Sequence, residues 1–375
     1  MRPAELPSPE PQALAVSRRL LERIGAELAA GGNWMSFARY MELALHEPGL
    51  GYYAAGARKL GAGGDFVTAP ELSPLFARTL ARQVRELLAP GEAVLEFGAG
   101  SGALAEVLIS ELPGVSYQIL ETSAELRERQ RRRLGAGAQW LERLPERFRG
   151  VMLANEVVDA MPVHVLAWTP DVILERGVCA NEGGLAWCDR PAEPALRSAA
   201  EKIEVEIPPS GRYESELALF ARAWMRSLGR ILERGAILVA DYGFPQAEYF
   251  HPQRSMGTLA CHYRQHVHGD PFWLPGLQDV TAHVDFSALA RAAAEGGLEL
   301  LGYASQARFL VNCGITELLG SEDPEDAARY LPAAAAANKL LSPSEMGELF
   351  KLLAVGRGTQ RPLLGFARGD RSDAL

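Results

Sequence analysis

The chain has 375 residues, of which 48% are hydrophobic and 23% charged, so it can bury a large core and is not a disordered polymer. Its length is typical of an α/β protein with insertions, in one or two domains. The formal net charge of −9 argues against broad binding to a nucleic-acid backbone, which requires a basic surface.

The first 90 residues are expected to form a helical region. Apolar residues recur at helical spacing over 13–29, and two glycines follow that predicted helix. Further helices are predicted over 36–45 and 73–88. The stretch 49–71 between them is rich in glycine and aromatic residues and is unlike a plain linker. We therefore treat 1–90 as a separate helical region.

The most distinctive local pattern is the apolar run Val94–Phe97, which breaks into Gly98, Gly100 and Gly102 before a predicted helix. Glycines at these positions permit a sharp turn, positive φ angles and close approach of a ligand to the backbone. The helix that follows would present its N-terminus to that ligand. The spacing fits a dinucleotide loop as well as an adenosyl-cofactor loop, and a glycine turn without any ligand is the alternative interpretation.

After the glycine loop, strands and helices alternate, which predicts a doubly wound parallel sheet. Strands are expected at 117–120, 151–154 and 236–240, and helices at 124–134 and 214–233. We divide the rest of the chain into an α/β core at 91–250 with a β-rich insertion at 163–207, a substrate-facing lid that returns to the sheet at 251–318, and a C-terminal helix with closing strands at 319–375.

An arginine-rich run covers 127–133 within one of the predicted helices. Ser123 is placed to cap this helix, so the arginines would lie near its negative C-terminal end. The run is therefore interpreted as a solvated helix terminus rather than an RNA-binding patch.

Cysteine usage and the chain's N-terminal sequence bear on its compartment. Cys179, Cys188, Cys261 and Cys313 are widely spaced, contain no Cys-x-x-Cys pair and do not resemble the disulfide framework of a secreted protein. Neither a signal-peptide pattern, nor a transit-peptide pattern, nor a transmembrane stretch is recognised. These observations predict a reducing, cytoplasmic environment without membrane insertion.

Polar residues follow the predicted strands at the sheet edge where α/β proteins bind ligands. Glu121 lies 23 positions after Gly98, which suits a carboxylate that accepts hydrogen bonds from both hydroxyls of a ribose. Asn155 and Glu156 follow the next strand, and Asp241 follows a later one. Glu96 lies inside its strand, where a carboxylate is costly unless it is hydrogen-bonded. A nicotinamide enzyme offers no obvious reason for Glu96, so this residue favours a cofactor with a cationic sulfonium.

Several separate sequence blocks resemble the MidA-like methyltransferases, a family that includes a mitochondrial complex I assembly factor that methylates an arginine. The resemblance runs from about Ser36 to about Gly356. It is carried by the blocks Gly64–Glu71, Asn155–Pro162, Asp241–Gly243 and Gln278–Phe286. Because these blocks occur in the right order, they are far more specific than the glycine loop alone.

The resemblance implies a class I, Rossmann-like methyltransferase that uses S-adenosyl-L-methionine and methylates an arginine of a protein, by family analogy a respiratory complex I subunit. Carboxylates would orient the guanidinium of that arginine. The implied catalytic residues are Glu156, Asp159 and Asp241, with Asp65 and Glu71 completing an anionic pocket. The implied cofactor-binding residues are Asp65, Thr68, Glu96, Gly98, Gly100, Gly102, Glu121, Asn155 and Glu156. The resemblance also implies that the helical region 1–90 forms a cap over the substrate.

Simpler interpretations of these acidic residues stay open, because Asp159 suits a helix cap, Asp65 a turn and Asp241 a strand end. Four histidines at 262, 266, 268 and 283 lie near aspartates, but their spacing matches no standard metal site. We expect no metal and interpret the segment 251–286 as a lid anchored by Phe272 and Trp273. Two other functions stay open: an NAD(P)-dependent oxidoreductase, and a noncatalytic assembly factor that keeps the cofactor fold.

Overall fold

The computed structural model describes residues 6–55 and 68–375. The chain divides into two compact units, each built from discontinuous segments. The first unit comprises Met1–Phe66, Asp159–Ala221 and Gln246–Asp285, and the second comprises Val67–Val158, Arg222–Pro245 and Phe286–Leu375. Asp65, which the sequence analysis assigned to the cofactor site, lies outside the described residues.

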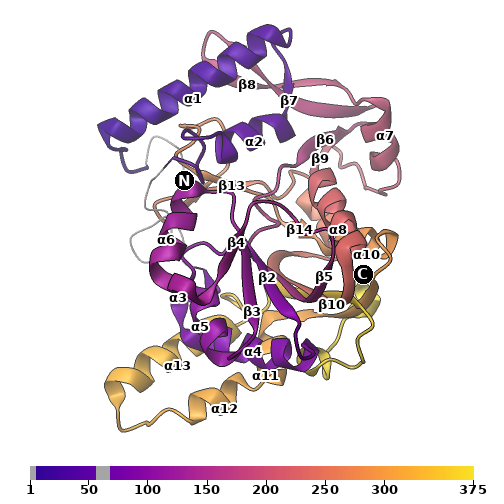
Figure 1. Ribbon diagram of the computed structural model, residues 1–375. Coiled ribbons are helices and arrows are strands. Elements are labelled where there is room, and N and C mark those ends of the chain that lie inside the picture. The colour runs from indigo at the N-terminus through magenta and orange to yellow at the C-terminus, as the bar shows by residue number, and fades with distance from the viewer. Residues whose placement is uncertain (1–5, 56–67) are drawn as a thin grey trace. The chain divides into compact units, whose positions relative to one another are not determined.

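The second unit contains a large mixed sheet with the strand order β15-β16-β10-β5-β2-β3-β4. Figure 1 labels β10, β5, β2, β3 and β4 of this sheet. Strands β10, β5, β2, β3 and β4 are parallel to one another, whereas β16 is antiparallel to both β10 and β15. The bounds are β2 Ala93–Phe97, β3 Ser116–Leu120, β4 Gln139–Leu141, β5 Phe148–Asn155, β10 Leu232–Phe244, β15 Glu299–Ser305 and β16 Phe350–Arg357. The predicted doubly wound α/β core is confirmed.

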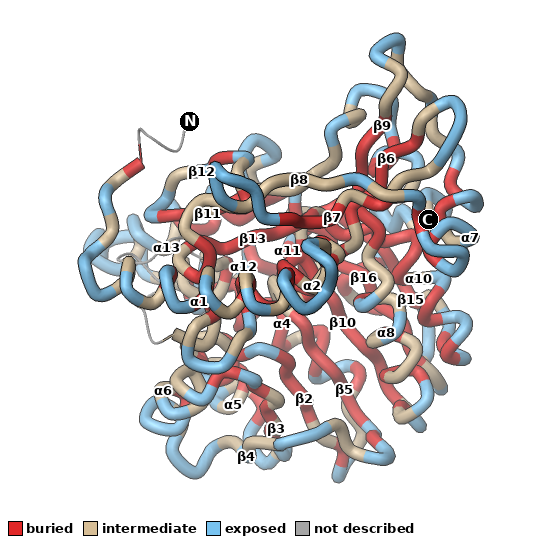
Figure 2. The backbone as a smooth tube through the Cα atoms, turned by 90° about the horizontal axis from the view of Figure 1, so that it is seen from above, coloured by how far each residue is buried: buried red, intermediate tan, exposed pale blue. Residues whose placement is uncertain are grey.

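The central strands of this sheet are apolar along nearly their whole length, as expected for parallel strands covered on both faces. Figure 2 shows β2, β5 and β10 buried over most of their length. Strand β2 lies between β3, the next strand in the chain, and β5, so the strand order reverses at β2. In open α/β sheets, ligands bind outside the carboxyl ends of the strands at such a reversal.

The second unit has several helices, and some of them, including α4 and α5, share one hydrophobic cluster with the sheet. Their bounds are α3 Ala69–Leu72, α4 Pro74–Leu87, α5 Ala103–Glu111, α6 Ala124–Leu134, α10 Phe286–Glu295, α11 Gln306–Asn312, α12 Ile315–Gly320 and α13 Ala327–Leu341. Helix α8, Leu219–Ile231, begins in the first unit and ends in the second. Within residues 6–55 and 68–375, no helix combines the length and apolarity that a membrane crossing needs.

The first unit combines two helices from the start of the chain with antiparallel strands. One sheet has the order β1-β7-β6-β9 with β8 paired to β7, and a smaller sheet has the order β12-β11-β13. The bounds are α1 Pro11–Ala30, β1 Met35–Ser36, α2 Phe37–His46, β6 His164–Trp168, β7 Ile173–Asn181, β8 Gly184–Pro191, α7 Pro194–Ala200, β9 Tyr213–Leu217, α9 Gln246–Tyr249, β11 Ala260–Tyr263, β12 His266–His268, β13 Asp279–Thr281 and β14 Val284–Asp285. The predicted β-rich character of 163–207 is confirmed by the antiparallel pairs β6–β7 and β7–β8.

The helix predicted over 214–233 is wrong at both ends. Its first residues form strand β9, and its last two belong to β10. The buried carboxylate of Glu216 explains the strand, because it accepts hydrogen bonds from the backbone amides of Thr258 and Leu259 and from the hydroxyl of Tyr249. Tertiary contacts of this kind override the modest helix propensity of glutamate.

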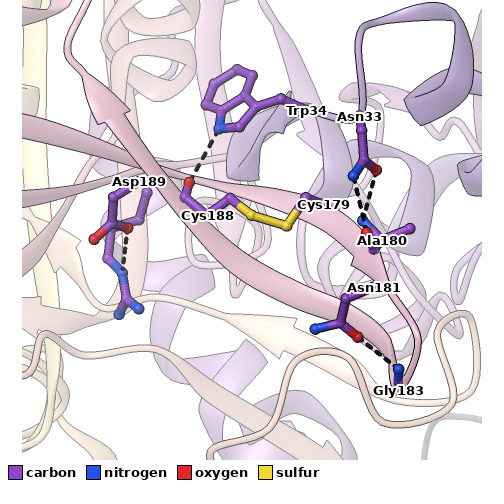
Figure 3. The surroundings of a disulfide bond; sticks show 9 residues. Asn33, Trp34, Cys179, Ala180, Asn181, Gly183, Cys188 and Asp189 are labelled. Atoms are coloured by element: carbon purple, nitrogen blue, oxygen red, sulfur yellow. Dashed lines mark hydrogen bonds and ion pairs between the residues drawn. A yellow bond between two sulfur atoms is a disulfide. The ribbon is translucent and has the colours of Figure 1, made fainter.

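A disulfide joins Cys179 on β7 to Cys188 on β8, although the cysteine spacing was interpreted as that of a protein in a reducing compartment (Figure 3). The two residues are nine positions apart in the chain, yet the hairpin brings their Cα atoms to 5.9 Å. The indole of Trp34 donates a hydrogen bond to the carbonyl of Cys188 at 3.1 Å, on the same hairpin. The cysteine pattern therefore gives no support to a reducing compartment.

We predict that reducing the Cys179–Cys188 disulfide lowers the free energy of unfolding by about 2–3 kcal/mol, because the bond closes a short loop in the unfolded chain. Denaturant unfolding with and without reductant measures the change. In the double variant Cys179→Ser/Cys188→Ser, reductant should have no effect. Four free thiols in the denatured, non-reduced wild-type protein would contradict the assignment.

Candidate active site

The glycine loop connects the end of β2 to the start of α5, at the strand reversal of the second unit. Gly98, Gly100 and Gly102 all have positive φ, at 57°, 54° and 82°, as the sequence predicted. A Cβ atom on Gly98 would lie 3.2 Å from the side chain of Val157, and the amide of Gly98 donates to the carbonyl of Leu120 at 3.0 Å. The loop is therefore fixed against the ends of both neighbouring strands, and side chains are excluded from its turn.

Glu121 lies directly after β3 and is buried. One carboxylate oxygen accepts a hydrogen bond from the amide of Ser123 at 2.9 Å, and the other accepts from the side chain of Gln130 at 3.0 Å. Burial raises the pKa of Glu121, while these two donors oppose the rise. A carboxylate has about four acceptor positions, so this one retains capacity for ligand hydroxyls.

Glu96 is buried within β2 and accepts a hydrogen bond from the hydroxyl of Tyr117 at 2.7 Å. Burial raises the pKa of Glu96 to about 7; the Tyr117 hydrogen bond opposes this, and the nearby charge of Glu121 adds to it. The hydrogen-bond donor to the Glu96 carboxylate is thus the hydroxyl of Tyr117 and not an amide of the glycine loop. Glu96 is therefore a buried carboxyl group in the strand that leads into the loop, and it holds its proton more tightly than an exposed glutamate does.

Asn155 and Glu156 follow β5, the strand on the other side of β2. Glu156 has a φ of 54°, which is uncommon for a residue with a side chain. Its Oε1 accepts hydrogen bonds from the side-chain amide of Asn155 and from the backbone amide of Ala69, both at 3.1 Å. Backbone strain of this kind concentrates at functional sites, where the surroundings enforce it.

Asp241 lies on β10, the next strand of the sheet, and has no exposed surface. Its Oδ2 accepts hydrogen bonds from the amides of Val157 and Val158 at 3.2 and 2.9 Å, and its Oδ1 accepts from the amide of Tyr242. The backbone amide of Glu156 donates to the carbonyl of Ala240 in the same strand. Asp241 thus fixes the turn that holds Glu156 in its strained conformation.

The segment that begins at Thr68 also reaches the glycine loop. Thr68 precedes α3 and makes no side-chain capping bond to that helix. Glu71 in α3 hydrogen-bonds to the hydroxyl of Ser101 in the loop, and Arg133 donates to the same hydroxyl at 3.1 Å. Glu71 was predicted to belong to an anionic pocket, and its contact with Ser101 could not be seen in the sequence because the two residues are 30 positions apart.

Asp159 belongs to the first unit, one residue after the chain leaves the second. It is buried, its carbonyl accepts a hydrogen bond from the amide of Ala282 at 2.9 Å, and its charge contributes to the raised pKa of Tyr53. Phe272 and Trp273, the predicted anchors of the lid, pack in the same unit against Tyr40 and Tyr263.

The arginine-rich helix α6 has the structure that its sequence predicts. Ser123 caps it by accepting a hydrogen bond from the amide of Leu126, and Arg131, Arg132 and Arg133 occupy its last turn. One residue of this helix, Gln130, is buried and contacts both Glu121 and the carbonyl of Gly100. This residue was not predicted from the sequence, although it is the single uncharged position within the charged run 127–133, and that is the signal that marks it.

The second unit therefore brings together groups that suit S-adenosyl-L-methionine. The glycine turn has no side chains to block a ligand, the helix α5 presents its N-terminus there, and Glu121 offers acceptors for ribose hydroxyls. When bound, this cofactor supplies a methyl group already activated by its sulfonium.

A family model for S-adenosyl-L-methionine-dependent methyltransferases matches residues 75–304 of the chain. The chain belongs to this family. The match confirms the resemblance, the fold class and the cofactor inferred from the sequence. Of the two cofactor types that fit the glycine loop, it favours S-adenosyl-L-methionine over a dinucleotide.

Solved and curated relatives agree with the family. A Burkholderia thailandensis protein crystallised with S-adenosyl-homocysteine is 49% identical, with a TM-score of 0.94 over 99% of this chain and 100% of that one. The mitochondrial protein arginine methyltransferase NDUFAF7 of Mus musculus is 31% identical over 86% of this chain and 80% of its own length. The same protein of Danio rerio is 29% identical over 91% of this chain and 87% of its own length.

We predict that Glu96 makes stability depend on pH. Its folded-state pKa of about 7 lies above the ordinary value of 4.5, so its contribution to stability is complete below about pH 4.5 and is lost as the pH rises through about 7. Between about pH 4.5 and pH 8, wild type should lose about 3 kcal/mol of unfolding free energy relative to Glu96→Gln, as measured by denaturant unfolding. Parallel pH profiles for the two proteins would contradict this assignment.

Proposed function

We propose that this methyltransferase transfers the methyl group of S-adenosyl-L-methionine to an arginine side chain of a protein substrate. The relatives named protein arginine methyltransferases support this acceptor. The single observation that carries the proposal is Glu156, a carboxylate held in a strained conformation beside the glycine loop. A positioned carboxylate is the group that binds a guanidinium most strongly, through paired hydrogen bonds.

In the proposed reaction, a nitrogen of the guanidinium attacks the sulfonium methyl group. The new bond is N–CH₃, the S–CH₃ bond breaks with its electron pair going to sulfur, and S-adenosyl-homocysteine leaves. The guanidinium starts protonated and gives up one proton to water in the same process, so the methylated product again carries a single positive charge. Glu156 would orient the reacting nitrogen in line with the methyl group and hold the positive charge throughout, which lowers the barrier mainly by alignment and electrostatics.

The other acidic residues receive distinct roles in this proposal. The carboxylate of Asp241 accepts hydrogen bonds from three backbone amides, those of Val157, Val158 and Tyr242. We therefore assign Asp241 to positioning Glu156 rather than to contact with substrate. Gly98, Gly100, Gly102, Glu121 and Asn155 are assigned to the cofactor, together with Glu96 as the family resemblance implies. Asp159, Asp65 and Thr68 keep the roles that the family resemblance implies. Asp159 would bind the methyl acceptor, and Asp65 and Thr68 would bind the cofactor.

The proposed acceptor is a protein rather than a nucleic acid, in keeping with the acidic net charge. A respiratory-complex subunit is the acceptor class that the family resemblance implies. The relatives named above are mitochondrial proteins of animals. For this chain we propose a cytoplasmic location, where such a subunit would be accessible before assembly.

We predict that Glu156→Gln reduces methyl transfer by about a hundredfold, because the amide keeps the size of the side chain but loses the charge that binds the guanidinium. The assay supplies methyl-labelled cofactor and a lysate from cells lacking the protein, and identifies methylarginine after hydrolysis. Glu233→Gln, on an exposed glutamate paired with Arg147, is the matched control and should keep full activity.

Asp241→Asn provides a second comparison, because it should lower both activity and the unfolding free energy, whereas Glu156→Gln should lower activity alone. Labelled methyl groups on another residue type would overturn the arginine proposal. A wild-type protein that labels nothing would favour a noncatalytic role, and equal labelling by wild type and Glu156→Gln would remove Glu156 from the mechanism.

A further inference from the structure

Helix α6 contains one residue that its charged sequence does not explain. Gln130 has no exposed surface, and it is the one buried position of a helix composed largely of arginine and glutamate. The arginines around it have partners of their own: Arg129 pairs with Glu125, and Arg132 with Glu128. Burial of an amide requires hydrogen bonds to compensate for the water it loses. The contacts of Gln130 therefore indicate what the residue does.

The Gln130 amide makes three hydrogen bonds, to the glycine loop, to Glu121 and to Trp140 of β4. Its Nε2 donates to the carbonyl of Gly100 at 2.9 Å and to a carboxylate oxygen of Glu121 at 3.0 Å. Its Oε1 accepts from the indole nitrogen of Trp140 at 2.9 Å. Only this orientation is compatible with the partners, because the opposite one would face two acceptors with an oxygen and a donor with an NH₂ group.

This arrangement joins the two segments that the cofactor assignment depends on. Gly100 belongs to the glycine loop after β2, and Glu121 follows β3. A Cβ atom on Gly102 would lie 3.6 Å from the Cγ of Gln130, so the loop also packs directly against this side chain. The second oxygen of Glu121 is held by the amide of Ser123. With both oxygens held by protein donors, the direction of the remaining acceptor positions on Glu121 is fixed.

We propose that Gln130 is a positioning residue for S-adenosyl-L-methionine, which locks Glu121 and the glycine loop in the arrangement that receives the ribose of the cofactor. This inference rests on the ribose role assigned to Glu121 under the proposed function. Without the Gln130 amide, the buried carboxylate loses a donor and turns toward another partner, and it then meets the ribose hydroxyls in the wrong direction. Trp140 contributes to this positioning, because its indole NH fixes the orientation of the Gln130 amide.

The test measures the dissociation constant of S-adenosyl-homocysteine by calorimetry for wild type and Gln130→Met. Methionine fills a similar volume and offers no amide, so we expect the dissociation constant to rise about tenfold. Arg132→Met is the matched control, on the same helix at a side chain that is 78% exposed, and should leave the affinity unchanged. Trp140→Phe keeps a ring but removes the donor that orients the amide, and should raise the constant by a smaller factor of about three.

A double-mutant cycle separates positioning from a general effect on the fold. In a Glu121→Ala background, Gln130→Met should change the dissociation constant by less than about twofold, because the group through which it acts is gone. A purely structural role would lower the thermal midpoint of the free protein but give equal factors in both backgrounds. Equal factors, or an unchanged affinity in Gln130→Met, would overturn the proposal.

Two further outcomes complete the interpretation. If Gln130→Met does not fold, Trp140→Phe carries the same test, and an unchanged affinity in that variant would overturn the proposal. If wild type does not bind S-adenosyl-homocysteine, both the positioning role of Gln130 and the assignment of the cofactor site are overturned. Because binding is measured without any methyl acceptor, a failure to methylate arginine leaves this test intact and counts only against the proposed function.

Discussion

Carboxylates buried at the ends of parallel strands must find hydrogen-bond donors, and this requirement organises the candidate site. Burial of an unpartnered carboxylate costs several kcal/mol, so each of these side chains is held by specific neighbours. Asp241 is held by backbone amides, Glu121 by an amide and Gln130, and Glu96 by Tyr117. The donors come from neighbouring strands and loops and from helix α6, so the same bonds that satisfy the carboxylates also hold the strand ends in place. A site preorganised in this way presents its remaining acceptor positions in fixed directions.

Much of the second unit could be predicted from its sequence, because its signals are local. The glycine spacing required positive φ angles, and all three glycines have them. The apolar runs that precede Gly98 and Asn155 predicted parallel strands, because a strand that is buried on both faces does not alternate between polar and apolar residues. Glu121 and Asn155 follow their strands directly, so their place at the ligand-binding edge followed from the strand assignment alone. Ser123 behaved as a helix cap for the same reason, because capping depends on three neighbouring residues.

Other features depend on contacts between distant residues, which sequence patterns do not reveal. Glu214–Leu217 has helical composition, yet it forms a strand because Glu216 binds residues more than forty positions away. The disulfide requires the β7–β8 hairpin, whose register is not visible in the spacing of Cys179 and Cys188. Asp241 could be located at a strand end, but its role in holding the turn after Glu156 required knowledge of which amides face it.

Amide hydrogen exchange of the protein with and without S-adenosyl-homocysteine tests the location of the site most directly. The account predicts slower exchange on ligand addition in three peptides, which cover the glycine loop at 97–104, the Glu121 turn at 120–126 and the segment after β5 at 154–158. The β7–β8 hairpin at 173–191 should exchange at the same rate in both states. Protection that is absent from the glycine loop, or that is confined to the hairpin, would contradict the account.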